Sequence, residues 1–251
     1  MKSHTLRFPG HSEELAARLD EPEGGIRRGT VLFAHCFTCS KNLRAVGRIS
    51  RAMTEAGLGV FRFDFTGLGE SEGDFADTNF SSNVEDLLAA AGYLEKEWQA
   101  PGLLMGHSLG GAAVLQAAER LESVQAVATI GAPCKPEHVA HLLSDSREEI
   151  ESSGRAHVVL AGRSFTIKKQ FLEDLEEQHM NEIIRGLGKA LLIFHSPVDK
   201  TVDIDNAAHI YRMARHPKSF ISLDKADHLL SKEEDARYVG SVAAAWARRY
   251  L

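Results

Sequence analysis

The chain of 251 residues has no uninterrupted apolar run long enough to span a membrane, and its first residues lack the apolar core of a signal peptide. It also has little positive charge, since 29 Lys and Arg residues face 35 Asp and Glu residues, for a net charge of -6. No basic stripe is therefore available to neutralise phosphates. We expect neither a membrane nor a nucleic acid among its partners.

Cysteine is scarce, with 3 residues in the chain. This small odd number does not suit a disulfide framework, so the expected location is a reducing cytoplasm. Hydrophobic residues make up 43% of the chain and charged residues 25%, which is ordinary for a globular protein with a full core. The composition therefore predicts a globular fold without a disulfide framework.

Short apolar runs alternate with amphipathic helical patterns almost from end to end. Most runs are continuous, as is typical of strands covered on both faces; the candidates are 31–34, 60–65, 103–105, 126–130, 191–194 and 220–223. Two half-polar segments, 5–8 and 15–19, are expected to be edge strands in an antiparallel pair. The alternation predicts an α/β fold with a mostly parallel central sheet of about eight strands and helices on both faces.

Capping patterns locate several helix ends. Ser82-x-x-Glu85 and Ser231-x-x-Glu234 have the form of capping boxes, so each is predicted to begin a helix. Gly57 is expected to end the helix that carries Val46, Ile49 and Met53.

One segment, 134–187, interrupts the alternation and is too long for a single crossover. It contains a predicted hairpin, 157–168, and a predicted helix near 169–180. Because it follows the sixth predicted strand, it should stand at the carboxyl edge of the sheet. We interpret the chain as a single domain, 1–251, with 134–187 as a lid insertion; a surface excursion without function is the alternative.

The most informative motif is Gly106-His107-Ser108-Leu109-Gly110, which follows an apolar run and leads into a helical pattern. This G-x-S-x-G pattern between a strand and a helix is typical of a nucleophile elbow, in which a sharp turn exposes a strained serine. Ser108 is therefore predicted to be a nucleophile.

A serine hydroxyl needs a base, and the base works best when a carboxylate orients it. Asp199 lies in the loop that leaves the predicted strand 191–194, and His228 lies in the loop after 220–223. Both loops leave the sheet at the edge where Ser108 is expected. The order Ser, Asp, His along the chain predicts the triad Ser108, Asp199 and His228.

Each triad member has rivals. Asp203 and Asp205 begin the next helix, where acids serve as caps, and Asp227 adjoins the histidine in sequence. Among the histidines, His107 is expected to pack beside the elbow and His195 to be structural. His138 and His141 have a spacing that suits a metal, but no third ligand is apparent, and we expect no metal and no cofactor.

Acyl transfer also needs hydrogen-bond donors for the developing oxyanion. The backbone N–H of Leu109, directly after the nucleophile, is one expected donor. The second should come from the loop after the strand 31–34, where the N–H of Phe37 is the first choice and that of Cys36 the second.

These residues resemble the α/β-hydrolase superfamily. The resemblance lies in His35 to Thr38, Asp64 to Ser71, the elbow, Asp199 and His228, and it implies the α/β-hydrolase fold and a serine hydrolase that cleaves carboxylic esters through an acyl-enzyme. Within the superfamily the chain is similar to cinnamoyl and feruloyl esterases. It is closer still to the hydrolase half of proteins fused to an osmotically inducible protein C (OsmC) domain, on the stretch 161–169. That similarity implies a functional link to an OsmC-type domain.

The chain departs from these relatives in one place, because Cys36 follows His35 where they usually have glycine. With Cys39 it forms a C-x-x-C pattern between a strand and a helix, which is a redox-motif context. The preferred interpretation is two small buried hydrophobic side chains. Cys134, at the start of the lid, is expected to be a packing residue.

Several functions therefore stay open. The first is a serine esterase acting on a small-molecule ester, and a thioesterase on the same triad is a variant of it. The second is a thiol-redox component that uses Cys36 and Cys39, and the third is a catalytically silent scaffold. The sequence does not determine the oligomeric state, for which a homodimer is one candidate.

Overall fold

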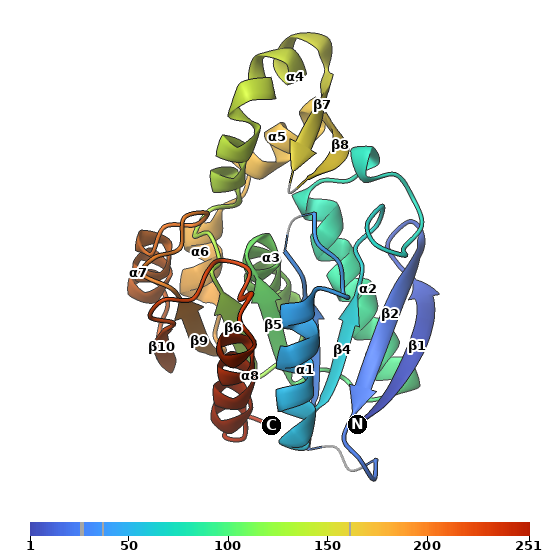
Figure 1. The fold of residues 1–251 in the computed structure, drawn as a ribbon, viewed down its shortest axis with the longest axis vertical. Helices are drawn as coiled ribbons and strands as arrows, with labels where there is room; N and C mark the ends of the chain where they lie inside the picture. The colour runs from blue at the N-terminus through green and yellow to red at the C-terminus, as the bar shows by residue number, and fades with distance from the viewer. Residues whose placement is uncertain (26–27, 37, 161) are drawn as a thin grey trace.

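The computed structural model describes residues 1–25, 28–36, 38–160 and 162–251. Eight strands form one sheet in the order β1-β2-β4-β3-β5-β6-β9-β10 (Figure 1). The strands are β1 (Lys2–Pro9), β2 (Glu14–Glu21), β3 (Thr30–Ala34), β4 (Gly59–Phe63), β5 (Leu103–His107), β6 (Ala126–Ile130), β9 (Ala190–His195) and β10 (Lys218–Ser222). From β4 to β10 all neighbours pair in parallel. The predicted α/β-hydrolase architecture is therefore confirmed.

Helices cover both faces of the sheet because alternate side chains of the buried strands point to opposite sides. Val31 and Phe33 pack with α1 (Arg44–Glu55) and α8 (Glu233–Ala247), whereas Leu32 packs on the other side with α2 (Phe80–Glu97) and α3 (Leu109–Ala117). Two further helices, α6 (Met180–Gly186) and α7 (Asp205–Met213), join this second side. Continuous apolar strands are what two covered faces require.

The first two strands correct the sequence prediction in one respect. They pair antiparallel, as expected, and β1 is an edge strand. However, β2 also pairs with β4, so it lies inside the sheet and most of its side chains are buried. Small Ala16 and Ala17 allow this close packing although Arg18 and Asp20 make the segment look half-polar.

Both predicted capping boxes are wrong. Helix α2 begins at Phe80, and its capping box joins Asn79 to Ser82, so the serine takes the third helical position instead of the cap. Helix α8 begins at Glu233 after Lys232, without a side-chain cap. The predicted end of α1 at Gly57 is close, since the helix ends at Glu55 and Gly57 has a φ of 93°.

Most of segment 134–187, from η3 (Pro136–Ser146) to α5 (Lys169–Glu176), rises beyond the carboxyl ends of the strands, at the top of Figure 1. It contains the 3-10 helix η3, then α4 (Arg147–Ser153), a two-stranded antiparallel hairpin of β7 (Arg155–Leu160) and β8 (Arg163–Lys168), and α5. The hairpin was predicted, whereas the single helix near 169–180 is in fact α5 alone. Helix α6 follows it and packs against α3 and α7.

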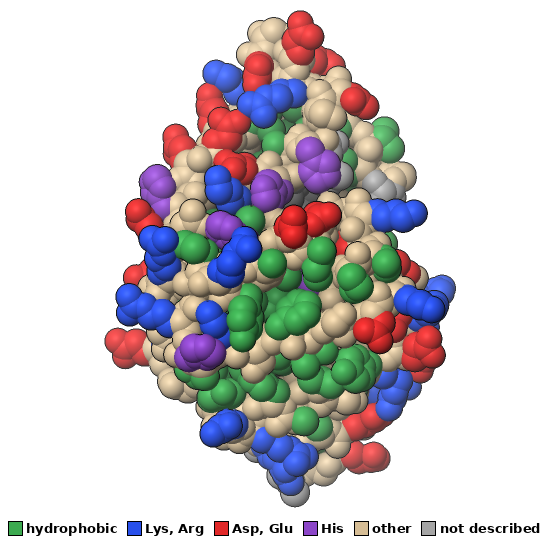
Figure 2. Space-filling view, turned by 90° about the vertical axis from the view of Figure 1, so that its left-hand side faces the viewer, with side chains coloured by type: hydrophobic (Ala, Val, Ile, Leu, Met, Phe, Trp, Pro, Cys, Tyr) green, Lys and Arg blue, Asp and Glu red, His purple; other side chains and the backbone are tan. Residues whose placement is uncertain are grey.

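The other end of the sheet is the exposed edge strand β10. Figure 2 shows the molecule from this side, with hydrophobic side chains gathered across the middle of the face and charged side chains above and below them. Phe220 of β10 is 41% exposed. None of the helices in the described part of the chain combines the length and hydrophobicity needed to cross a bilayer.

Candidate active site

Ser108 occupies a strained turn between β5 and α3. Its φ is 55°, in a region that residues other than glycine rarely adopt. The flanking glycines make the turn possible, since a Cβ on Gly106 would lie 2.2 Å from the carbonyl oxygen of Gly110, and a Cβ on Gly110 would lie 2.4 Å from that of His35. The segment therefore has the backbone of a nucleophile elbow.

The elbow is joined to the loop that carries His228. The Ser108 N–H donates to the carbonyl oxygen of Ile130 at 2.8 Å, which places the next residue, Gly131, beside the serine. A Cβ on Gly131 would lie 3.3 Å from both His228 Nδ1 and Asp199 Oδ2. On the other side of the elbow, the rings of His107 and His228 are 5.0 Å apart. The three residues predicted as a triad thus come from three strand exits at one rim of the sheet.

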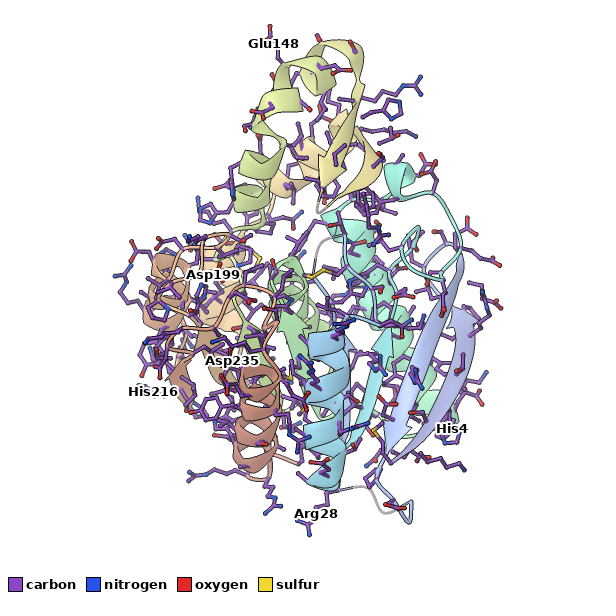
Figure 3. The ribbon with its side chains drawn as sticks, viewed as in Figure 1. His4, Arg28, Glu148, Asp199, His216 and Asp235 are labelled. Carbon is purple, nitrogen blue, oxygen red and sulfur yellow. A yellow bond between two sulfur atoms is a disulfide. The ribbon has the colours of Figure 1, made fainter. Side chains whose placement is uncertain are left out.

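Asp199 and His228 form a direct pair. His228 Nδ1 donates to Asp199 Oδ2 at 2.7 Å, and the other carboxylate oxygen accepts the N–H groups of Thr201 and Val202. Burial raises the pKa of Asp199, but the hydrogen bonds from His228 and Val202 outweigh this effect, and the net pKa lies below its ordinary value. The carboxylate therefore stays ionised beside the ring. Figure 3 shows Asp199 in the loops just below the lid.

The rival residues have other partners. Asp227 accepts hydrogen bonds from the backbone and the hydroxyl of Ser231, and Asp203 accepts the N–H of Asp205 at the start of α7. His195 is buried, and its Nε2 donates to the carbonyl oxygen of Val202 at 2.8 Å, which suits the structural role expected of it.

Cys36 and Cys39 correct the preferred sequence interpretation, because a disulfide joins them (the yellow bond between sulfur atoms in Figure 3). The Cys39 N–H donates to the Cys36 carbonyl oxygen at 3.1 Å, and this turn brings the two Cα atoms to 5.3 Å, within bridging range. The pair is therefore not two packed thiols. Cys134 is a free buried cysteine, as predicted, and burial raises the pKa of its thiol.

The predicted oxyanion donors are only partly visible. Phe37 lies outside the described residues. Leu109 opens α3, so its N–H is among the helix-terminal amides that have no partner inside the helix. A cavity of about 10 Å³, the size of one water molecule, is lined by Cys36, Leu109 and seven other residues.

A buried ion pair supports the loop that contains the disulfide, and the sequence analysis missed it. Lys41 Nζ lies 2.6 Å from Asp64 Oδ2, and the Lys41 N–H donates to Asp64 Oδ1 at 2.6 Å. Asp64 is fully buried and also accepts the N–H of Glu70 at 2.9 Å. The only sequence signal was a lone lysine beyond the C-x-x-C pattern, whose partner on the loop after β4 is decided by tertiary structure.

Two further histidines near the site are held neutral. Burial lowers the pKa of His107 to about 3, and the charge of His228 adds to this effect. Burial also lowers the pKa of His35, whose Nδ1 donates to the carbonyl oxygen of Cys36 at 2.8 Å. Neither ring is placed to act as the base, because both are enclosed by the core.

Two of the contacts between segment 134–187 and the rest of the fold involve its hairpin and α5. At the hairpin tip, Arg163 Nη1 donates to the carbonyl oxygen of Thr38 at 2.9 Å. At the other contact, Phe165 packs edge-on against Phe75, with ring centroids 5.2 Å apart, and Asp174 accepts hydrogen bonds from the backbone and the hydroxyl of Ser81.

Asn206, which no sequence pattern singled out, holds the start of segment 134–187. Its Oδ1 accepts the Cys134 N–H at 3.0 Å and the His138 Nδ1–H at 2.6 Å. His138 is therefore engaged with an amide and not aimed at a metal together with His141. In the described ranges no cluster of three or more His, Cys, Asp or Glu side chains could hold a metal ion.

Three comparisons with known proteins bear on this site. A family model described as "Serine aminopeptidase, S33" matches residues 25–150, half of the chain. The crystal structure of the esterase domain of a Rhodothermus marinus protein is 53% identical, with a TM-score of 0.83, and the alignment covers 100% of this chain and 99% of that one.

Two other relatives are more distant. Est1E from Butyrivibrio proteoclasticus, solved with ferulic acid bound, is 18% identical over 98% of each chain with a TM-score of 0.83, a likeness that shows the fold alone. An "Uncharacterized 31.7 kDa protein in traX-finO intergenic region" from Escherichia coli is 32% identical over 120 residues, which are 46% of this chain and 41% of that protein. The chain thus matches less than half of the length of that relative.

Proposed function

The chain belongs to the serine aminopeptidase S33 family of hydrolases, and from this membership we propose that it is a serine esterase that forms an acyl-enzyme. The observation that carries the proposal is the hydrogen bond of 2.7 Å between His228 and Asp199 beside the elbow of Ser108. The 53% identity to an esterase domain over the whole chain favours esters as substrates over the peptides that the family description suggests.

In the proposed mechanism His228 Nε2 takes the proton of Ser108 while Oγ attacks the ester carbonyl. Asp199 accepts a hydrogen bond from the Nδ1–H of His228, so the lone pair on Nε2 is available to the serine and the imidazolium that forms is stabilised. His228 then returns the proton to the leaving alcohol, and water attacks the acyl-enzyme by the same steps in reverse.

The oxyanion is proposed to form between the amides of Leu109 and Phe37. The position of Leu109 at the start of α3, directly after Ser108, supports this placement, because its N–H has no partner inside the helix. The positive end of the α3 dipole adds to the stabilisation of negative charge there.

We further propose that segment 134–187 acts as a lid that shapes the acyl pocket. Its contact with Thr38, beside the proposed oxyanion donor, supports this role over a surface excursion without function. On the other side, an open groove beside His228 is lined by Val198 and Leu229, which are 51% and 44% exposed. This groove suits the departure of the alcohol.

The test is a panel of p-nitrophenyl esters of graded acyl length, a hydroxycinnamate ester and an aminoacyl p-nitroanilide. We expect hydrolysis of esters, with Ser108→Ala lowering kcat by roughly a millionfold, as for other triads. A fluorophosphonate probe should label the wild type but not this variant, which distinguishes an enzyme from a silent scaffold. Ser152→Ala, on the surface of α4, is the matched control. Unchanged turnover in a folded Ser108→Ala variant would disprove the mechanism.

A second candidate function is thiol–disulfide exchange, and the Cys36–Cys39 disulfide favours it. A dithiol would attack one sulfur, expel the other as a thiolate and leave as a disulfide, while two protons and two electrons stay on the cysteines. Cys39 is partly exposed and gives such a thiol access. Loss of two free thiols on mild oxidation, without ester hydrolysis, would favour this function over the esterase.

Further expectations accompany the esterase proposal. A thioesterase on the same triad is tested by adding acyl thioesters to the panel. The open edge strand β10, with Phe220 outward, supports a homodimer, which the native mass in solution checks. A cytoplasmic location and a functional link to an OsmC-type domain stay predictions.

A further inference from the structure

Arg163 stands at the tip of the lid hairpin. It begins β8 and pairs with Leu160 across the tip, at the opposite end of the hairpin from the pair of Arg155 and Lys168. In Figure 1 the tip of the hairpin points down toward the body, over the carboxyl ends of the strands. The contact of Arg163 with Thr38 places the residue against the loop that follows β3.

Two contacts fix the orientation of the guanidinium. Nη1 donates to the carbonyl oxygen of Thr38 at 2.9 Å, and the group lies over the ring of Phe165 at 5.3 Å from its centroid. Phe165 is itself held by Phe75. Because stacking and a hydrogen bond both restrain it, the side chain is pre-organised for a further partner.

The side chain of Arg163 is exposed, and its charge has no acidic partner among the residues that the structure describes. The other end of the same strand differs, since Lys168 pairs with Asp77. A guanidinium has five N–H donors in a planar fork that matches a carboxylate, and the contact with Thr38 uses one of them.

The positive charge of Arg163 acts on a side chain in the loop after β3. Burial is the main reason why the pKa of His35 is lowered, and the positive charge of Arg163 contributes to the shift. His35, the disulfide and Thr38 belong to the loop from which an oxyanion donor is proposed. Arg163 is thus an oriented cation beside the loop of the proposed oxyanion donor, without an acidic partner among the described residues.

We propose that Arg163 is a specificity-determining residue that binds a free carboxylate of the ester substrate. The inference rests on the proposed esterase function and narrows its substrate class to esters with an acidic group remote from the scissile bond. Nη1 keeps its bond to Thr38, while the remaining donors bind the carboxylate in a forked geometry.

The test compares esters matched in length, mono-p-nitrophenyl adipate against p-nitrophenyl hexanoate. The wild type should favour the adipate ester in kcat/KM, and Arg163→Gln should lower this preference by about 10- to 100-fold. Added salt should weaken the preference of the wild type. Arg155→Gln is the matched control, because it removes an equal charge from the exposed base of the same hairpin.

The outcomes separate this inference from the esterase proposal. If Arg163→Gln lowers both esters equally, the residue only positions the Thr38 loop and the inference is wrong, while the esterase stands. If Arg163→Gln does not fold, Arg163→Lys decides: a reduced preference supports the forked contact, and an unchanged preference overturns it. If the folded wild type hydrolyses neither ester and the probe does not label Ser108, both proposals fall together.

Discussion

His107 donates a hydrogen bond from Nε2 to the backbone carbonyl oxygen of His228 at 2.7 Å, and the two rings lie 5.0 Å apart. The residue that precedes the proposed nucleophile thus holds the loop of the proposed base. Since a carbonyl oxygen only accepts, the proton must lie on Nε2 of His107. Protonation of Nδ1 would place a positive charge in the core.

The buried state of His107 predicts a dependence of stability on acid. Its pKa is about 3 in the folded protein, against 6.5 for an ordinary histidine, so the unfolded chain binds more protons between these values. The stability that the fold has with His107 neutral is fully present above pH 6.5 and is lost as the pH falls toward 3. The free energy of unfolding should decrease by about 2 kcal/mol from pH 7 to pH 5 through this group alone.

Urea denaturation at both pH values measures the effect. His107→Gln should reduce the pH slope, whereas His157→Gln, on the exposed face of the hairpin, should leave it unchanged. Equal slopes for the wild type and the His107→Gln variant would contradict the assignment.

Asp199→Asn should reduce kcat for a neutral ester by on the order of 10⁴-fold, since the amide cannot hold the required tautomer of His228 or balance its charge. The Asp199 carboxylate has a lowered pKa, so this contribution persists across the neutral range and disappears only in acid. Asp203→Asn, on an exposed residue four positions away, is the control. Comparable losses in both variants would move the carboxylate role away from Asp199.

Replacing both Cys36 and Cys39 by serine should lower the free energy of unfolding by about 2 kcal/mol, because the bridge closes a short loop and its entropic effect grows with loop length. Urea unfolding with and without dithiothreitol measures it. The reductant should destabilise the wild type and have no effect on the double variant. A wild type insensitive to reductant would show that the bridge contributes nothing to stability.

Lys41→Met should destabilise the fold by about 3 kcal/mol, since it leaves the carboxylate of Asp64 buried without its cation. Because Asp64 also binds the N–H groups of Lys41 and Glu70, esterase activity should fall as well. Lys96→Met, on a side chain that is 82% exposed, is the control and should change stability by less than about 0.5 kcal/mol. A folded Lys41→Met variant of unchanged stability would mean that the ion pair is replaceable.

The pattern of residues alone predicted the parallel sheet, the hairpin of the lid and the positions of Ser108, Asp199 and His228. These features depend on local periodicity, which a few neighbouring residues determine. They also depend on the rule that the strands of a parallel sheet end at one edge. Helix starts were less predictable. Asn79 and Lys232 take the capping positions that the sequence pattern gave to nearby serines, and tertiary contacts decide between such neighbouring candidates.

Only the tertiary structure decided which polar groups meet across the fold. The partnership of Lys41 with Asp64, the closure of Cys36 on Cys39, the inward place of β2 and the contact of Arg163 with Thr38 each depend on how separate segments pack. Burial and Coulomb attraction between residues distant along the chain leave no periodic trace in a sequence. Local sequence patterns therefore predicted the candidate active site, and long-range packing determined which residues surround and orient it.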